Sequence, residues 1–233
     1  MSIWQLPNVI AHAKKVSRLK FYASGLLFDN DGVLVDSHHA AIAAWAQWCS
    51  EYAPHVDWNT GDNAGVRAED RVRQWIARPE LFEEANDRIN QLEQDTAHET
   101  VALAGAVELT NSLKPGCWTV VTSANPNLGR ARLIAAGIPV PAELVTAADV
   151  SAGKPNPDPY LLGAKRLGFE PEDCVVFEDA IAGVQAGLAA GAGLVIGVGE
   201  RALVTEADIV IRDLSGITFD GEALTISDKI RLR

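Results

Sequence analysis

The sequence is poor in features that mark several classes of protein. Its 233 residues contain only three cysteines, Cys49, Cys117 and Cys174, which lie far apart and form no Cys-x-x-Cys pair. Such a set supports neither a disulfide framework nor a structural zinc site, so we expect a cytoplasmic location, where thiols stay reduced. No apolar run approaches the roughly 20 residues that span a bilayer, and we therefore expect no membrane partner.

Basic side chains are also scarce, since 20 Lys and Arg stand against 31 Asp and Glu, for a formal net charge of -11 at pH 7. Nucleic-acid binding depends on clustered Lys and Arg, so we expect no nucleic-acid partner. The same charge repels an anionic substrate, and a bound divalent cation is the usual way to overcome such a field. With 48% hydrophobic residues, the chain can bury one large domain or a domain with an insertion.

The first twenty residues differ from the rest. They contain four basic residues and no acidic residue, and their apolar positions from Ile3 to Val16 recur at helical spacing. We expect residues 1–20 to form an N-terminal extension, a helix docked on the body, rather than a targeting peptide.

Beyond residue 20, short β-branched runs alternate with helical segments. Apolar strands followed by helices predict an α/β fold, a Rossmann-like parallel sheet covered on both faces. The helices that begin near residues 128, 159 and 180 each stop at a glycine, which is a common helix terminator. The predicted strands are 25–29, 118–123, 174–179, 193–198 and 207–211.

One interval breaks this alternation. Residues 37–106 have almost no strand pattern and indicate three helices, over about 40–52, 69–77 and 81–100. Four of the six tryptophans lie there, and we expect them to pack the core of a small helical bundle rather than form an aromatic binding site. The prediction is an α/β core of residues 21–36 and 107–233, interrupted by a small helical domain of residues 37–106.

Polar residues stand where the predicted strands end. Asp29 and Asp31 follow the first strand, Ser123 the second, and Glu178 and Asp179 the third. Lys154 lies in the loop before the helix at 159. Each alone has an ordinary explanation, such as a turn, a helix cap or a solvated lysine. The carboxyl ends of parallel strands share one edge of the sheet, so we expect the whole set to gather there.

These residue types suit phosphoryl transfer. Oxygen ligands from Asp29, Asp31 and Asp179, with few carboxylates and room for water, favour Mg²⁺. Ser123, the backbone of the turn at Ala124 and the ammonium of Lys154 can bind a phosphate group. An ionised aspartate can attack phosphorus to give an aspartyl-phosphate, and a second one can protonate the leaving group.

Four segments, LLFDNDGVLVDS, VVTSAN, GKPNPDPY and VVFEDAIAGVQAGLAAG, resemble in order the four motifs of the haloacid dehalogenase superfamily, over roughly residues 21–215. The resemblance implies a core of that fold with a helical cap. It implies that Asp29 is the nucleophile and a Mg²⁺ ligand, and that Asp31 is the general acid and base whose backbone carbonyl also binds the metal. The remaining assignments are Ser123 and Lys154 for phosphate, Asp179 as the third metal ligand and Glu178 nearby.

Residues 145–191 are especially similar to the sugar-phosphate phosphatases of this superfamily and to β-phosphoglucomutase. The leading hypothesis is a Mg²⁺-dependent phosphatase of a small phosphorylated metabolite, a sugar or polyol phosphate. A mutase is an alternative, which Ala124-Asn125 favours and Ala41 opposes, because the mutases have a cap histidine at the latter position. A phospho-accepting receiver domain is a further alternative, disfavoured by Asp31 and by the helical insertion.

The cap is expected to select the substrate. Residues 62–69 resemble the substrate-facing cap loop of the family, with Gly65 allowing close approach and Arg67 reaching for hydroxyls or phosphate. An ordinary helix N-terminus explains the same residues. His38 lies at the hinge into the cap and is a candidate substrate contact. Asn125 either binds a leaving-group hydroxyl or caps the following helix. A capped enzyme with a single site is complete as a monomer, so we expect a monomer rather than an oligomer.

Overall fold

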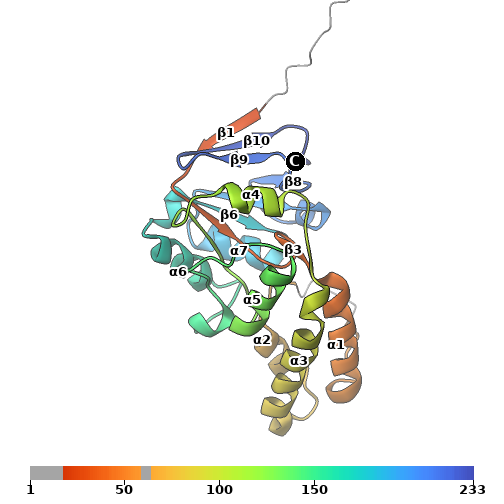
Figure 1. Ribbon diagram of the computed structural model, residues 1–233. Helices are drawn as coiled ribbons and strands as arrows, with labels where there is room; N and C mark the ends of the chain where they lie inside the picture. Colours follow the sequence, from red (N-terminus) through yellow and green to blue (C-terminus); the bar gives the residue numbers. More distant parts are fainter. Residues whose placement is uncertain (1–17, 59–63) are drawn as a thin grey trace, which may run out of the picture.

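The centre of the molecule is a parallel sheet whose five strands run in the order β5-β2-β6-β7-β8. The computed structural model describes residues 18–58 and 64–233. All five strands coincide with segments that the apolar pattern predicts as strands, and the predicted α/β fold is confirmed (Figure 1). Their bounds are β2 Gly25–Phe28, β5 Trp118–Val120, β6 Cys174–Glu178, β7 Leu194–Val198 and β8 Ile209–Ile211.

Alternate side chains of the central strands enter two separate apolar layers. Leu26 and Phe28 of β2 point into one layer, with Leu109 and Leu133, whereas Leu27 points into the other, with Tyr160. Burial on both faces explains why these strands are apolar throughout rather than alternating. The helices are α4 Ala106–Ser112 and α5 Pro126–Ala135 in the first layer, and α6 Asp158–Leu167 and α7 Ile181–Ala189 in the second.

A second, antiparallel sheet of order β1-β10-β9 packs against the first apolar layer. Its strands are β1 Arg18–Tyr22, β9 Ile217–Phe219 and β10 Ala223–Ser227. The prediction that residues 18–20 belong to a helical extension is therefore wrong. Leu19 and Phe21 pack on the core, whereas Arg18, Lys20 and Tyr22 are exposed. This alternation is the two-residue period of a strand. The predicted helix of the extension otherwise falls on residues 1–17, outside the described part.

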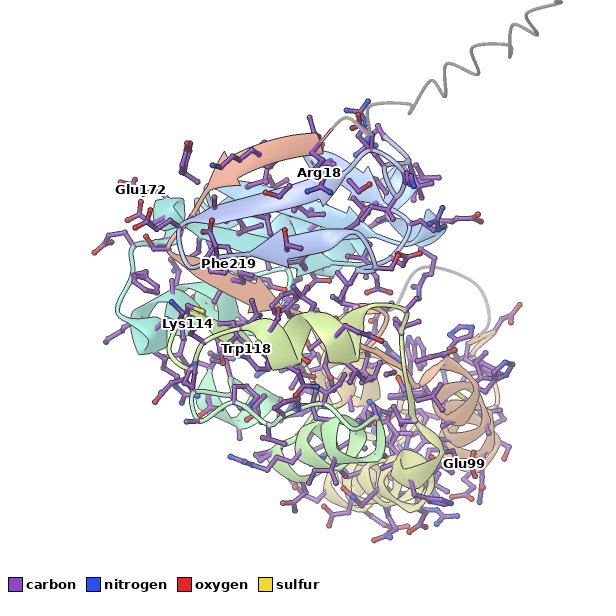
Figure 2. The ribbon with its side chains drawn as sticks, turned by 45° about the horizontal axis from the view of Figure 1, so that its top comes forward. Arg18, Glu99, Lys114, Trp118, Glu172 and Phe219 are labelled. Carbon is purple, nitrogen blue, oxygen red and sulfur yellow. The ribbon has the colours of Figure 1, made fainter. Side chains whose placement is uncertain are left out.

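The helical domain leaves the core and returns to it through two short paired strands, β3 Val35–Asp36 and β4 Val101–Ala102. We call the helices between them, residues 38–99, the cap. Figure 2 shows Arg18 and Phe219 in the antiparallel layer at one end of the molecule and Glu99 at the cap end. The cap elements are α1 His38–Tyr52, α2 Ala68–Trp75, α3 Phe82–Thr96 and the 3-10 turns Pro79–Leu81 and Ala97–Glu99.

Tryptophans fill the core of the cap, as the sequence predicts. Trp48 is fully buried, and its Nε1 donates to the carbonyl of Ala85 at 2.7 Å, so α1 is tied to α3. Trp45 stands between Trp48 and Trp75, with ring centroids 5.5 Å from each. The edge-to-face contact between Trp45 and Trp75 joins α1 to α2 and adds to the burial of a large apolar area.

Three further 3-10 turns lie in the core, at Ala147–Asp149, Pro171–Asp173 and Glu200–Val204. Within residues 18–58 and 64–233, no helix is both long enough and apolar enough to cross a bilayer.

Candidate active site

A buried ion pair lies at the carboxyl end of β2, between that strand and the loop before α6. Asp29 follows β2 and is 4% exposed, and Lys154, from the loop before α6, is 2% exposed. Lys154 Nζ lies 2.8 Å from Asp29 Oδ1 and also donates to the carbonyl of Val121, just beyond β5, at 2.9 Å. β2 pairs with β5, and Lys154 donates to the carbonyl of Val121 just beyond β5, so residues 125 positions apart meet at this edge of the sheet.

Glu178 is a second carboxylate in contact with Lys154. Its Oε1 lies 2.7 Å from Lys154 Nζ and accepts a hydrogen bond from the Tyr160 hydroxyl at 2.6 Å, while its Oε2 accepts from the backbone N–H of Asp179 at 3.1 Å. Glu178 is fully buried and does not line the cavity described below. Tyr160 is a site residue that the motifs contain but the sequence analysis misses. In the sequence, Tyr160 is a tyrosine on the apolar face of a predicted helix, a position that is typical of an ordinary core residue.

The carboxylates at this edge repel one another. Burial first, and then the charge of Glu178, hold the pKa of Asp29 well above its usual range. The same two causes raise the pKa of Asp179 from its ordinary value of 3.8 to about 7. Burial alone would lower the pKa of Lys154, but Asp29 and Glu178 raise it above its usual value, so the lysine stays charged.

This donor set suits a hard divalent cation. Oxygen atoms of Asp29, Glu178 and Asp179 all lie within 4.8 Å of one another in a buried position. Two glycines make room for them: a Cβ on Gly32, whose φ is +84°, would collide with the carboxylate of Asp179, and a Cβ on Gly183 with that of Glu178. Buried carboxylate oxygens fit Mg²⁺ in its ligand type, and a cation would favour the ionised form of each acid.

Asp31 lies two residues after Asp29 but faces a different group. Its Oδ1 accepts a hydrogen bond from the hydroxyl of Ser37 at 2.6 Å and forms an ion pair with Arg132 Nη1 at 3.1 Å. The Asp31 carboxylate is therefore outside the metal-compatible cluster and lines the cavity, at the position expected of an acid that acts on the substrate.

Ser123 and Ala124 begin the loop after β5 and line the same cavity. The Ser123 hydroxyl donates to the carbonyl of Gly65 in the cap at 2.6 Å, and the Ala124 N–H donates to Thr122 Oγ1 at 3.1 Å. The predicted phosphate-binding loop is thus in direct contact with the cap.

Asn125 has the structural role that was one of its two predicted alternatives. It is the N-cap of α5, with Oδ1 accepting from the backbone N–H of Leu128 at 2.9 Å. Its Nδ2 donates to Asn90 Oδ1 of the cap at 3.0 Å, so the amide also bridges core and cap beside the cavity.

The cavity itself has a volume of about 560 Å³ and lies between core and cap. Its floor carries Asp29, Asp31 and Asp179, and its roof comes from the cap, including His38 and Gly65 as predicted. Trp45 and Trp75 reach it from the cap core, so the same side chains pack the bundle and line the cavity.

Arg67 is not where the sequence analysis expects it. Its guanidinium forms a two-bond ion pair with Asp70, at 2.7 and 2.9 Å, and donates to the carbonyl of Val150 at 3.3 Å. It does not belong to the cavity lining, since it lies against Gly153 of the core loop. In this structure Arg67 joins the cap to the core, and its contact with substrate stays a prediction. Residues 62–63 of the same predicted loop lie outside the described part.

A parallel sheet with a lysine-bearing acidic site under a helical cap defines a capped α/β enzyme. The chain belongs to the haloacid dehalogenase-like hydrolases, whose family pattern matches residues 23–191. It is 38% identical over 200 residues to hexitol phosphatase A of Escherichia coli, a match that covers 83% of this chain and 93% of that protein. It is 31% identical over 227 residues to 2-deoxyglucose-6-phosphate phosphatase 1 of Saccharomyces cerevisiae, covering 85% and 91% of the two chains.

The fold is also that of a solved mutase. The β-phosphoglucomutase structure from Clostridium difficile aligns with a TM-score of 0.70 at 21% identity, covering 84% of this chain and 94% of the other. At that identity the likeness shows the fold alone. The predicted family is confirmed, and the protein is an enzyme of the hydrolase class.

Proposed function

We propose that this protein is a Mg²⁺-dependent phosphatase of small phosphorylated sugars or polyols that works through an aspartyl-phosphate on Asp29. The observation that carries the proposal is the buried Asp29–Lys154 pair beside Asp179, at the floor of a cavity that the cap covers. The similarity to hexitol and 2-deoxyglucose-6-phosphate phosphatases supports the substrate class.

The chain's own groups account for two half-reactions. Lys154 holds Oδ1 of Asp29, and the other carboxylate oxygen attacks phosphorus while the bond from phosphorus to the leaving oxygen breaks. Asp31, facing the same cavity, gives its proton to the leaving alkoxide. Asp31 then takes a proton from water as the water attacks phosphorus, which releases phosphate and restores Asp29.

Ser123 and Lys154 are the proposed donors to the phosphate oxygens. The Ser123 hydroxyl donates to the carbonyl of Gly65 in this structure, so a bound phosphate would compete with that carbonyl for the hydrogen bond. Asp29 and Asp179, with Glu178 behind them, would hold Mg²⁺. When bound, Mg²⁺ supplies positive charge that offsets both the acidic site and the phosphate.

Phosphate release from a panel of hexitol phosphates, 2-deoxyglucose 6-phosphate and glycerol phosphate tests the proposal. We expect release from at least one member in Mg²⁺ and its loss in EDTA. Absence of metal-dependent release from every member would contradict the proposed function.

Hydrolysis is favoured over mutase activity by one position in the cavity. Ala41 lines the wall where the mutases carry a histidine, and a methyl group can neither donate nor accept a proton there. With β-glucose 1-phosphate as substrate, NMR should show free glucose and phosphate. Formation of glucose 6-phosphate would instead support the mutase.

The cysteines Cys49, Cys117 and Cys174 are all free, which supports the proposed cytoplasmic location.

Metal binding should couple to pH through Asp179. Because its pKa rises from 3.8 to about 7 on folding, the metal-free folded protein holds a proton that the unfolded chain has lost across this window. Stability of the metal-free protein should therefore fall as the pH rises from about 4 to 7. A cation favours the ionised form, so we expect Mg²⁺ to raise Tm more at pH 8 than at pH 5.5. Thermal unfolding with Mg²⁺ or EDTA measures this, and an equal Mg²⁺ shift at both pH values would contradict it.

A further inference from the structure

Arg132 is a buried cation that belongs to none of the four motifs. It lies on α5, 4% exposed, between two carboxylates from different parts of the protein. Its Nη1 is 3.1 Å from Asp31 Oδ1 in the core, and its Nη2 is 3.2 Å from Glu93 Oε1 on α3 of the cap. Glu93 is only 7% exposed, so the ion pair of Arg132 and Glu93 is buried in the contact between α3 and α5, at the wall of the cavity.

Burying the Arg132 guanidinium without partners would be costly. Asp31 and Glu93 supply the opposite charge that it needs. A buried ion pair is a poor source of stability, because desolvation offsets most of the attraction. Asp31 and Glu93 nevertheless raise the pKa of Arg132 against the effect of burial, so the guanidinium keeps its charge. Burial raises the pKa of Glu93, and Arg132 opposes that rise. A charge that adds little stability is better explained by a role at the site that it faces.

Ser37 and Arg132 both contact the same oxygen of the Asp31 carboxylate. Ser37 Oγ and Arg132 Nη1 both approach Oδ1, at 2.6 and 3.1 Å. Two donors from different directions fix the rotation of the carboxylate. The second oxygen is then the atom available for proton transfer in the cavity that Asp31 lines.

We propose that Arg132 is a positioning residue for Asp31 and that Glu93 holds it in place from the cap. The inference rests on the proposed phosphatase function, in which Asp31 protonates the leaving group. Since Glu93 belongs to the cap and Asp31 to the core, the contact orients the acid when α3 is packed on α5. Activity on leaving groups that need a proton thereby depends on cap docking.

The test uses two leaving groups. p-Nitrophenolate departs without a proton, whereas the alkoxide of a sugar or polyol needs one. We expect Arg132→Met to lower kcat/KM about 100-fold for the best alkyl phosphate of the panel, which is at the lower end of what general-acid catalysis contributes. For p-nitrophenyl phosphate we expect a loss below about 5-fold. kcat/KM reports the steps up to the first irreversible one, and here that step, phosphoryl transfer to Asp29 with departure of p-nitrophenolate, needs no acid.

Conservative variants keep the test decisive if Arg132→Met folds poorly. Arg132→Lys should recover part of the alkyl phosphate activity, and Glu93→Gln should lower it about 10-fold with the same selectivity for leaving group, as expected for a residue acting through another. Arg88→Met is the matched control, because Arg88 pairs with Glu51 on the outside of the cap and should leave both activities unchanged.

Arg132 also lines the cavity, so direct substrate binding must be separated from positioning. In the Asp29→Asn background, which we expect to bind substrate without turnover, calorimetry should give the same Kd for the alkyl phosphate with and without the added Arg132→Met change, to within about 3-fold. A Kd that weakens as much as kcat/KM would overturn the inference, as would equal losses for both leaving groups. Failure of the proposed function would look different, with no phosphate released from either substrate by the unaltered enzyme.

Discussion

We expect Asp29→Asn to lower phosphate release by at least about 10³-fold while the protein stays folded. An amide oxygen is a poor nucleophile, and covalent catalysis at Asp29 has no substitute at this edge of the sheet. The fold should survive because the change also relieves repulsion: Asp29 lies among Glu178, Asp179 and Asp31, and burial and these neighbours already raise its pKa. Lys154 retains Glu178 as a partner at 2.7 Å.

Steady-state phosphate release with circular dichroism melting measures both parts of this prediction. Asp173→Asn is the matched control, since Asp173 is an exposed acid at the opposite, amino end of β6 and should keep full activity. Mass spectrometry of acid-quenched enzyme should also show the added phosphoryl group in the unaltered chain and not in Asp29→Asn. Near-normal activity in Asp29→Asn would mean that the nucleophile is another residue.

Lys154→Met should cost both activity and stability. The ammonium is shared between Asp29 and Glu178 at 2.8 and 2.7 Å, and removing it leaves two buried carboxylates facing each other. Breaking a buried ion pair by deleting one partner typically costs about 3–5 kcal/mol, and we expect a loss of unfolding free energy in that range. Without Lys154 the pKa of Asp29 rises further, which disfavours the ionised nucleophile, and we expect turnover to fall below detection.

Urea unfolding and phosphate release across pH 5–9 measure this prediction. Lys165→Met is the control, because Lys165 is exposed on α6, the helix that follows the Lys154 loop, and its loss should change neither quantity. A Lys154→Met variant as stable as the unaltered protein would show that the carboxylates are protonated in the folded state already. Retained activity would remove Lys154 from the proposed phosphate site.

Much of the core was predictable because its signals are local. Strands such as residues 194–198 are apolar throughout, and such runs separated by helices that end in glycine specify a parallel sheet. The order of the motifs then places Asp29, Ser123 and Asp179 at one edge, whichever strands turn out to be neighbours. That is why the sequence locates these side chains together at the cavity.

The antiparallel sheet and α4 escaped prediction for a physical reason. β1 is only half-buried, and its basic Arg18 and Lys20 made residues 18–20 look like the end of a helix. β9 and β10 are short, and each is stabilised by its partner strands and by the apolar layer beneath rather than by its own composition.

The roles of Arg67 and Arg132 could be decided only by the folded chain. Arg67 looked like a substrate ligand from its loop, yet its direction depends on where the core loop at Val150 lies against the cap. Arg132 belongs to no motif, and its proposed role depends on its contact with Glu93, 39 residues away in sequence, across the contact between cap and core. Local composition and periodicity suffice for a sheet edge and its chemistry. The pairing of charges between the cap and the core depends on how their surfaces meet.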